Sequence, residues 1–112
     1  MSKVLFYAMT GEKVCLLHVL MNAVDLFQKG DEVRIIFEGK FVIWPVQLQE
    51  EKNPLYSKAL EGGLIAGVCL TCAKQFEVQE KIEALGLPLI GDMFGHAAMS
   101  PYVARGYQVV SI

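Results

Sequence analysis

Two cysteines separated by two residues offer the clearest chemistry in the chain. Cys69 and Cys72 lie in the stretch GVCLTCAK, residues 67–74. A C-x-x-C pair can act as a redox dithiol, supply half of a metal site, or pack as two small apolar side chains. The surrounding elements help to decide among these alternatives, because they set how exposed each sulfur is and how easily its thiol loses a proton. A thiol is a nucleophile only as its thiolate.

A histidine in a later loop is the next candidate. His96 lies in the segment GDMFGHAAM, which contains two glycines. Its imidazole can hydrogen-bond a thiolate or serve as its proton donor, and the alternative is a loop histidine exposed to water. The other histidine, His18, falls on the polar stripe of an expected helix and should face solvent. Cys15 lies on the apolar side of that helix and should pack there.

Metal and nucleotide sites find less support in the spacing of the residues. Structural zinc takes four nitrogen or sulfur ligands, and the chain has one C-x-x-C without a second such pair or a nearby pair of histidines. A mixed site made of the two cysteines and His96 is incomplete. The G-x-G-x-x-G fingerprint and the Walker phosphate loop are both missing. We therefore expect no metal and no organic cofactor.

Composition limits the partners of the chain. The 112 residues are expected to form a single domain, 1–112, and 54% of them are hydrophobic. Because this fraction is high for such a small chain, we expect part of its apolar surface to be covered in a homo-oligomer. The formal net charge is −2 and no cluster of lysines and arginines is present, which argues against nucleic acid and anionic membranes as partners.

The N-terminal stretch and the cysteines indicate a compartment. The stretch MSKVLFYAMTGEKVCLLHVL is interrupted by Gly11, Glu12 and Lys13, too early for a signal peptide. No run reaches the roughly 18 apolar residues of a membrane span. We expect a cytoplasmic protein whose three cysteines are reduced thiols.

Short apolar runs alternate with helical patterns, which predicts a parallel α/β sheet. The expected strands are Lys3–Met9, Asp31–Gly39, Leu64–Leu70 and residues 87–90 and 107–112. The expected helices cover about 12–29, 54–61 after an Asn53 cap, and 71–86 as one helix or a turn and a helix. A last short helix should have Ser100 as its N-cap and Pro101 in its first turn, and end at Gly106. Residues 40–56 should hold a loop or a short helix. Right-handed crossovers then make a three-layer α/β/α sandwich with a five-stranded, mainly parallel sheet.

Side chains that follow the strands of such a sheet meet at its carboxyl edge. This places residues 10–12, Glu38, residues 69–72 and residues 92–96 on one rim. The carboxylates there are expected to be solvated. Cys69 stands where a strand gives way to a helix, and the first N–H groups and dipole of a helix stabilise a thiolate.

Several stretches resemble the DsrE/DsrF-like proteins over essentially the full length of the chain. They are KVLFYAM, the glycine-containing turn into a long apolar helix, GVCLTCAK and the terminal YQVVSI. The distal GDMFGHAAMSPYVARGY is similar to a subgroup of small uncharacterised bacterial and archaeal members. The resemblance implies a five-stranded parallel sheet with helices on both faces. It also implies assembly into trimers or hexamers, homomeric or heteromeric.

The same resemblance implies an activity. Characterised members take part in sulfur relay, in which a cysteine accepts sulfane sulfur as a persulfide and hands it to a partner protein, in dissimilatory sulfur metabolism or in tRNA thiolation. Cys69 matches that cysteine, and Cys72 matches a second one that some members have. The chain is thus expected to be a sulfur carrier or sulfurtransferase that works with a protein donor and a protein acceptor.

Two other functions stay open. A dithiol oxidoreductase would use Cys69 and Cys72 as a reversible disulfide. A non-catalytic oligomeric binding module would keep the fold without the reaction. Cys72 could also attack a persulfide on Cys69, release sulfide and leave a disulfide, so the pair supports either relay or discharge.

Overall fold

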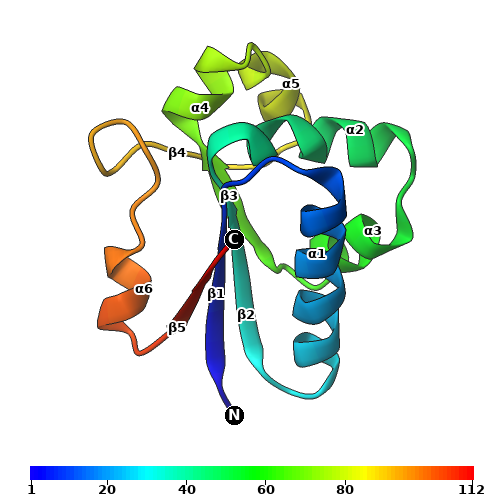
Figure 1. The fold of residues 1–112 in the computed structure, drawn as a ribbon, viewed down its shortest axis with the longest axis vertical. Coiled ribbons are helices and arrows are strands. Elements are labelled where there is room, and N and C mark those ends of the chain that lie inside the picture. Colours follow the sequence, from blue (N-terminus) through cyan, green and yellow to red (C-terminus); the bar gives the residue numbers. More distant parts are fainter.

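The computed structural model describes all of residues 1–112 (Figure 1). In chain order its elements are β1 (Lys3–Ala8), α1 (Lys13–Gln28), β2 (Glu32–Phe37), the 3-10 helix η1 (Gly39–Ile43), α2 (Trp44–Glu50), α3 (Pro54–Glu61), β3 (Ile65–Cys69), α4 (Leu70–Gln75), α5 (Gln79–Ala84), β4 (Leu89–Ile90), α6 (Ser100–Ala104) and β5 (Gln108–Ser111). No helix is long and apolar enough to cross a membrane.

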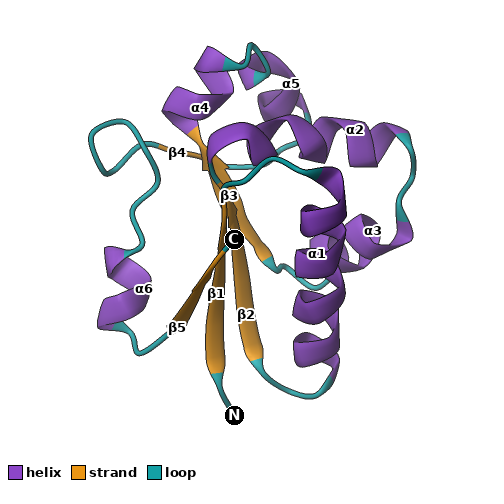
Figure 2. Cartoon of the chain, viewed as in Figure 1, coloured by secondary structure: helices purple, strands orange, loops and turns teal.

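The five strands form one parallel sheet in the order β4-β3-β2-β1-β5. Strand β1 is central, and it pairs with β2 through partners such as Val4 and Val33. Figure 2 shows this sheet between α6 on one side and α1 and α3 on the other. The predicted α/β/α sandwich with five parallel strands is therefore confirmed.

The strand order makes the two helical layers unequal. Strands β1, β2, β3 and β4 follow one another across the sheet, so right-handed crossovers put the connecting helices on one face. The chain then returns across the sheet to place β5 beside β1, and this return carries α6 to the opposite face. Because α6 has 5 residues, the layer on its side is thin.

The core follows from the apolar strands. Leu5 in β1, Ile35 and Phe37 in β2, and Leu16 and Leu20 in α1 are all fully buried. Removing a side chain of this size from water stabilises the fold by about 1.5–3 kcal/mol. Strand β1 is buried from Val4 to Ala8, as expected for a central strand that is covered on both faces.

Most of the predicted element boundaries hold, and of the two predicted N-caps one is confirmed and one is wrong. Asn53 does cap α3, because its side-chain oxygen accepts hydrogen bonds from Leu55 N at 2.9 Å and Tyr56 N at 3.1 Å. The prediction that Ser100 caps α6 is wrong. The first turn begins one residue earlier, since the Met99 carbonyl accepts from Tyr102 N and Val103 N, and no side chain caps the helix.

For the segment 71–86, which was predicted as one helix or as a turn and a helix, the structure has two short helices, α4 and α5, with a turn between them. Glu77 adopts a positive φ of 59° between α4 and α5, which a helix cannot accommodate. The segment after β2, expected to be a loop or short helix, holds η1 and α2. Pro45 lies in the first turn of α2, where a missing N–H costs no hydrogen bond.

Candidate functional site

Cys69 joins a strand directly to a helix. It is the last residue of β3 and the N-cap of α4, with an extended backbone at φ −60° and ψ 124°. Its sulfur accepts a hydrogen bond from Cys72 N at 3.4 Å. A spacing of three residues across this junction therefore turns both side chains toward the same carboxyl edge of the sheet.

Four side chains from separate parts of the chain meet at that edge. Glu38 follows β2, Cys69 ends β3, Cys72 lies in α4 and His96 lies in the loop before α6. One donor atom from each lies within 4.8 Å of all the others. We call Glu38, Cys69, Cys72 and His96 the four-residue cluster. These four residues were all predicted to lie at the carboxyl edge of the sheet, and the structure brings them together there.

The contacts within the four-residue cluster are short. Cys69 Sγ lies 3.1 Å from His96 Nδ1, and Cys72 Sγ donates to Glu38 Oε1 at 3.0 Å. His96 Nδ1 also lies 3.2 Å from Glu38 Oε1 and 3.6 Å from Cys72 Sγ. A chain of contacts therefore runs from Cys69 Sγ through the imidazole nitrogen and the carboxylate oxygen to Cys72 Sγ.

The expectation that Glu38 is a solvated rim carboxylate is wrong. Its side chain is only 6% exposed, because the loop after β4 covers the end of β2. Its second oxygen, Oε2, accepts from Ala97 N at 3.2 Å and lies 3.2 Å from the Tyr7 hydroxyl. That hydroxyl is also 2.7 Å from the Ala97 carbonyl oxygen. The buried carboxylate is therefore held by backbone and side-chain partners.

The loop between β4 and α6, orange in Figure 1, is fixed in place by its own hydrogen bonds. Met93 and His96 exchange two backbone hydrogen bonds of 2.8 Å each. The Gly95 carbonyl accepts from Thr71 N at 3.1 Å and from Thr71 Oγ1 at 2.7 Å. Gly95 has a φ of +88°, and a Cβ atom there would stand 2.5 Å from Thr71 Oγ1, so only glycine fits.

His96 lies at the boundary between the cluster and solvent. Its side chain is 38% exposed, while Nδ1 faces the sulfurs. Of the two interpretations of this histidine, the contact with a cysteine sulfur is the one that the structure supports. Cys69 and Cys72 beneath it are buried, with exposures of 0% and 6%.

Electrostatics in this conformation keep both thiols protonated. Burial raises the pKa of the Cys69 thiol, and burial together with the Glu38 carboxylate raises the pKa of Cys72 to about 12. Burial by itself would raise the pKa of Glu38, but hydrogen bonds from Cys72, Cys69 and Ala97 N lower it below its ordinary value. The expected thiolate at the start of α4 is therefore not the resting state, because the negative charge resides on Glu38.

The other residues predicted on the rim lie outside the cluster. Thr10 and Glu12 are exposed, and the Gly11 carbonyl accepts from Trp44 Nε1 at 2.8 Å. Asp92 caps the loop by accepting from Ala98 N at 2.9 Å. His18 is exposed, as predicted. None of these residues has a hydrogen bond to either sulfur of the cluster.

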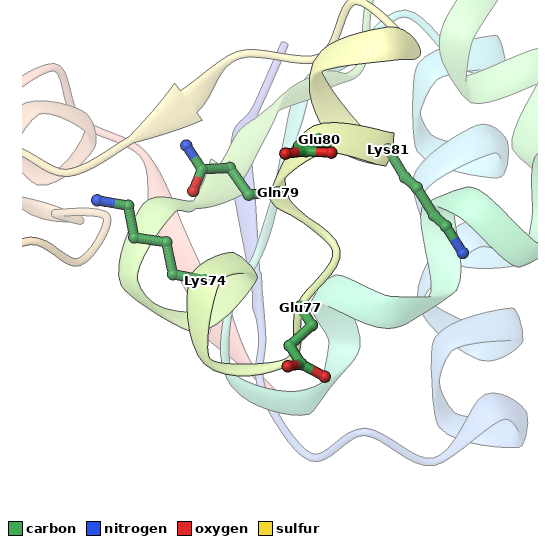
Figure 3. Close-up of a pocket in the computed structure, with 5 residues that line it drawn as sticks. All are labelled: Lys74, Glu77, Gln79, Glu80 and Lys81. Atoms are coloured by element: carbon green, nitrogen blue, oxygen red, sulfur yellow. The ribbon is translucent and has the colours of Figure 1, made fainter.

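A charged hollow lies on the outer surface of α4 and α5, away from the cluster. Figure 3 shows its side chains splayed in different directions around the turn between the two helices, and they are Lys74, Glu77, Gln79, Glu80 and Lys81. It contains none of the residues of the four-residue cluster. We assign it no chemistry.

Residue-type reasoning missed the role of Glu38 and its partners Tyr7 and Ala97. The sequence did carry a usable signal, since Glu38-Gly39 comes directly after β2, a strand that ends in the apolar residues Ile35, Ile36 and Phe37. The strand order places β2 between β1 and β3, so whatever follows β2 must face both Tyr7 and Cys69. Only the topology, not the residue type, identifies Glu38 as the fourth member.

The chain is similar to a solved structure in its fold and to another protein in its sequence. No family model matches it. Its fold is similar to the structure of a conserved protein of unknown function, BT1422 from Bacteroides thetaiotaomicron, with a TM-score of 0.76, 20% identity, and coverage of 99% of this chain and 95% of that one. It is also 38% identical over 97 residues to the uncharacterized protein MJ0733 of Methanocaldococcus jannaschii, covering 87% of this chain and 79% of that protein. The chain therefore belongs to the family of MJ0733.

Proposed function

We propose that the chain carries sulfane sulfur as a persulfide on Cys69, between a protein donor and a protein acceptor. One observation carries the proposal: Cys69 Sγ has an imidazole nitrogen at 3.1 Å and a second thiol in the same four-residue cluster. The resemblance to DsrE/DsrF-like proteins, with Cys69 in the position of their sulfur-carrying cysteine, is the second support. No organic cofactor is needed for this chemistry.

Loading exchanges one sulfur–sulfur bond for another. The Cys69 sulfur attacks the outer sulfur of the donor persulfide, the donor's S–S bond breaks, and the donor leaves as a thiol. The proton released by Cys69 passes to His96 and from there to the leaving sulfur. Delivery to the acceptor is the same exchange in reverse, so the protein is neither oxidised nor reduced over a complete cycle.

Cys72 gives the loaded protein a second outcome. Its sulfur can attack the inner sulfur of the Cys69 persulfide, forming a Cys69–Cys72 disulfide and releasing hydrogen sulfide. A thiol reductant then restores the two thiols. Because both sulfurs belong to the four-residue cluster, this discharge needs no partner protein.

The donor reaches Cys69 only when the His96 loop moves. The Cys69 side chain is fully buried, and the loop is attached to α4 through Thr71. In the proposal, docking of the donor displaces this loop and exposes the sulfur. Phe94 at the tip of the loop is fully exposed, so a docking partner meets an apolar side chain there.

The dithiol oxidoreductase is the second candidate function. The observation in its favour is that both sulfurs lie in one cluster, three residues apart across a strand-to-helix junction. Equilibration in thiol redox buffers, followed by mass analysis of the two cysteines, tests it. A Cys69–Cys72 disulfide that forms reversibly supports this function, and the lack of one excludes it.

We also infer that the chain works as a cytoplasmic homo-oligomer, a trimer or hexamer. Val14 and Met21 on α1 are 67% and 42% exposed, which fits a helix with more apolar surface than the sheet can cover. Three free cysteines suit a reducing compartment.

A persulfide challenge tests the sulfur carrier directly. Metal-free, reduced protein is incubated with a small-molecule persulfide, and intact mass is measured on wild type, Cys69→Ser, Cys72→Ser and the control Cys15→Ser. Cys72→Ser should gain the mass of one sulfur atom, because it cannot discharge. Wild type and Cys15→Ser should release sulfide and lose two hydrogens. An adduct that persists in Cys69→Ser contradicts the proposal.

A further inference from the structure

We propose that the four-residue cluster is also a binding site for a single zinc-like divalent cation. It presents two sulfur atoms, one imidazole nitrogen and one carboxylate oxygen, all within 4.8 Å of one another. The sequence suggested three donors from the two cysteines and His96, and Glu38 supplies the fourth. This inference goes beyond sulfur transfer and does not depend on it.

The spacing of the donor atoms fits a tetrahedral ion. With bonds of about 2.0–2.3 Å, the ligand atoms around a tetrahedral zinc lie roughly 3.3–3.8 Å apart. The contacts in the cluster are 3.0 Å from Cys72 Sγ to Glu38 Oε1, 3.1 Å from Cys69 Sγ to His96 Nδ1 and 3.2 Å from that nitrogen to Oε1. Cys72 Sγ lies 3.6 Å from His96 Nδ1, and all four donor atoms lie within 4.8 Å of one another. Shifts of up to about 1 Å would therefore admit the ion.

The partners of Glu38 orient its carboxylate as the outer shell of a metal site does. Oε2 accepts from Ala97 N and lies within hydrogen-bonding distance of the Tyr7 hydroxyl. Oε1 faces Cys72 Sγ and His96 Nδ1, and it also accepts a hydrogen bond from Gly39 N at 3.3 Å. Outer-shell hydrogen bonds of this kind fix the direction of a ligating oxygen and strengthen metal binding.

The donor set and its burial define the class of ion. Two thiol sulfurs and an imidazole favour zinc and other thiophilic first-row cations over magnesium and calcium, which prefer oxygen. Three of the four side chains, those of Glu38, Cys69 and Cys72, are at most 6% exposed. Four protein ligands in a buried position are the pattern of a closed site and leave no coordination position for a reacting water.

Metal binding and persulfide formation would exclude each other. Both require the Cys69 sulfur, so an ion held in the cluster keeps this cysteine from attacking a persulfide. Zinc therefore protects the thiols, and its removal makes the protein competent for sulfur transfer. In the persulfide challenge, metal-loaded wild type should accordingly neither release sulfide nor lose two hydrogens until a chelator is added.

Cobalt and zinc titrations of the full, reduced chain test the site. Cobalt(II) in wild type should give the visible absorption of a tetrahedral ion and the near-ultraviolet band of a cobalt–thiolate bond, saturating at one ion per chain. Zinc should displace it. Competition against a chromophoric chelator then measures zinc affinity, which should fall at least 100-fold in Cys69→Ser and Cys72→Ser and at least tenfold in Glu38→Gln and His96→Ala.

Matched controls make the outcome decisive. Cys15→Ser and Glu32→Gln change the same residue types outside the cluster and should bind like wild type. Circular dichroism confirms that each variant is folded, and His96→Ala replaces Glu38→Gln if the latter does not fold. The proposal is overturned if wild-type protein does not give the tetrahedral cobalt spectrum. It is also overturned if Cys15→Ser lowers the zinc affinity as much as Cys69→Ser does. Because the persulfide challenge uses metal-free protein, each proposal can fail without the other.

Discussion

At the scale of single residues, Glu38 controls the candidate site. It is the one carboxylate in the core, and its two oxygens serve different groups. Oε2 accepts hydrogen bonds from Ala97 N and the Tyr7 hydroxyl, whereas Oε1 accepts a hydrogen bond from the Cys72 thiol. Burial, together with the Glu38 carboxylate, raises the pKa of both thiols and so favours their protonated form in this conformation.

Tyr56 provides a residue-scale test of the core. Its hydroxyl is buried and has no hydrogen-bond partner, which costs about 1–3 kcal/mol. Tyr56→Phe should therefore raise the free energy of unfolding by about 1 kcal/mol in urea denaturation at neutral pH. Tyr7→Phe is the contrast, since the Tyr7 hydroxyl is bonded and its removal should lower stability. A destabilised Tyr56→Phe would show that this hydroxyl has a partner.

The same tyrosine predicts a pH dependence. Burial raises the pKa of Tyr56 to about 12, above the ordinary value of 10.0. A raised pKa means that the neutral form contributes stability, which is fully present below about pH 10 and is lost as the pH rises toward 12. The stability advantage of Tyr56→Phe over wild type should therefore grow across that window. An advantage that stays constant from neutral pH to pH 12 would contradict this assignment.

Residue types alone predicted part of the site. The two cysteines and the histidine could be named as candidates because their side chains carry chemistry and follow strands that end at the same edge of the sheet. Glu38 was not, because an isolated carboxylate after a strand is ordinarily solvated. What buries it is the loop that follows β4, nearly 60 residues later in the chain, and this contact cannot be read from local spacing.

At the scale of elements, the site depends on two junctions. Strand β3 passes into α4 without a loop, so Cys69 and Cys72 keep a fixed relation to the sheet. The loop after β4 is attached to α4 through Thr71 and brings His96 to the sulfurs. The order of the strands, more than their lengths, determines that these junctions are neighbours.

Loosening the loop should expose Cys69. Thr71→Val keeps the shape of the side chain but removes the hydrogen bond from Oγ1 to the Gly95 carbonyl. We expect alkylation of Cys69 in the native protein to accelerate severalfold, measured by peptide mass analysis over time. Thr10→Val is the matched control, because Thr10 is exposed on the rim and should leave the rate unchanged. Equal rates in wild type and Thr71→Val would show that another motion admits the reagent.

Sequence patterns predicted these elements well, except where backbone geometry decided the outcome. The five strands were recognisable as apolar runs between glycines and polar turns. The break between α4 and α5 was left open and the cap of α6 was misassigned. Both depend on the dihedral angles of one residue, Glu77 or Met99, whose type does not predict its conformation.

At the scale of the whole molecule, the helices divide unevenly between the two faces of the sheet. Helices α1 and α3 lie on one face and the short α6 on the other (Figure 2). Strand β5 lies at one edge of the sheet, and its residue Val110 is 38% exposed. Val110 lines a shallow hollow together with Val4 and Phe6 of β1 and Leu26 of α1. The surface around α1 and β5 is therefore where we expect copies of the chain to meet.

The expected oligomer can be tested on α1. Val14 and Met21 lie two turns apart on one side of this helix and are exposed in a single copy of the chain. Wild type should sediment as a trimer or hexamer, and the double variant Val14→Lys, Met21→Lys should shift toward the monomer. Val103→Lys, an exposed apolar position on α6, is the control and should sediment like wild type. A wild-type chain that stays monomeric at high concentration would contradict this expectation.

The location of a transferred sulfur atom tests the central proposal most directly. Reduced, metal-free Cys72→Ser protein is treated with a small-molecule persulfide, trapped with an alkylating reagent, and analysed by peptide mass spectrometry. The proposal predicts one additional sulfur on the peptide that contains Cys69 and none on the peptide that contains Cys15. An additional sulfur on Cys15, or an unmodified Cys69 under conditions that modify a free thiol, would contradict it.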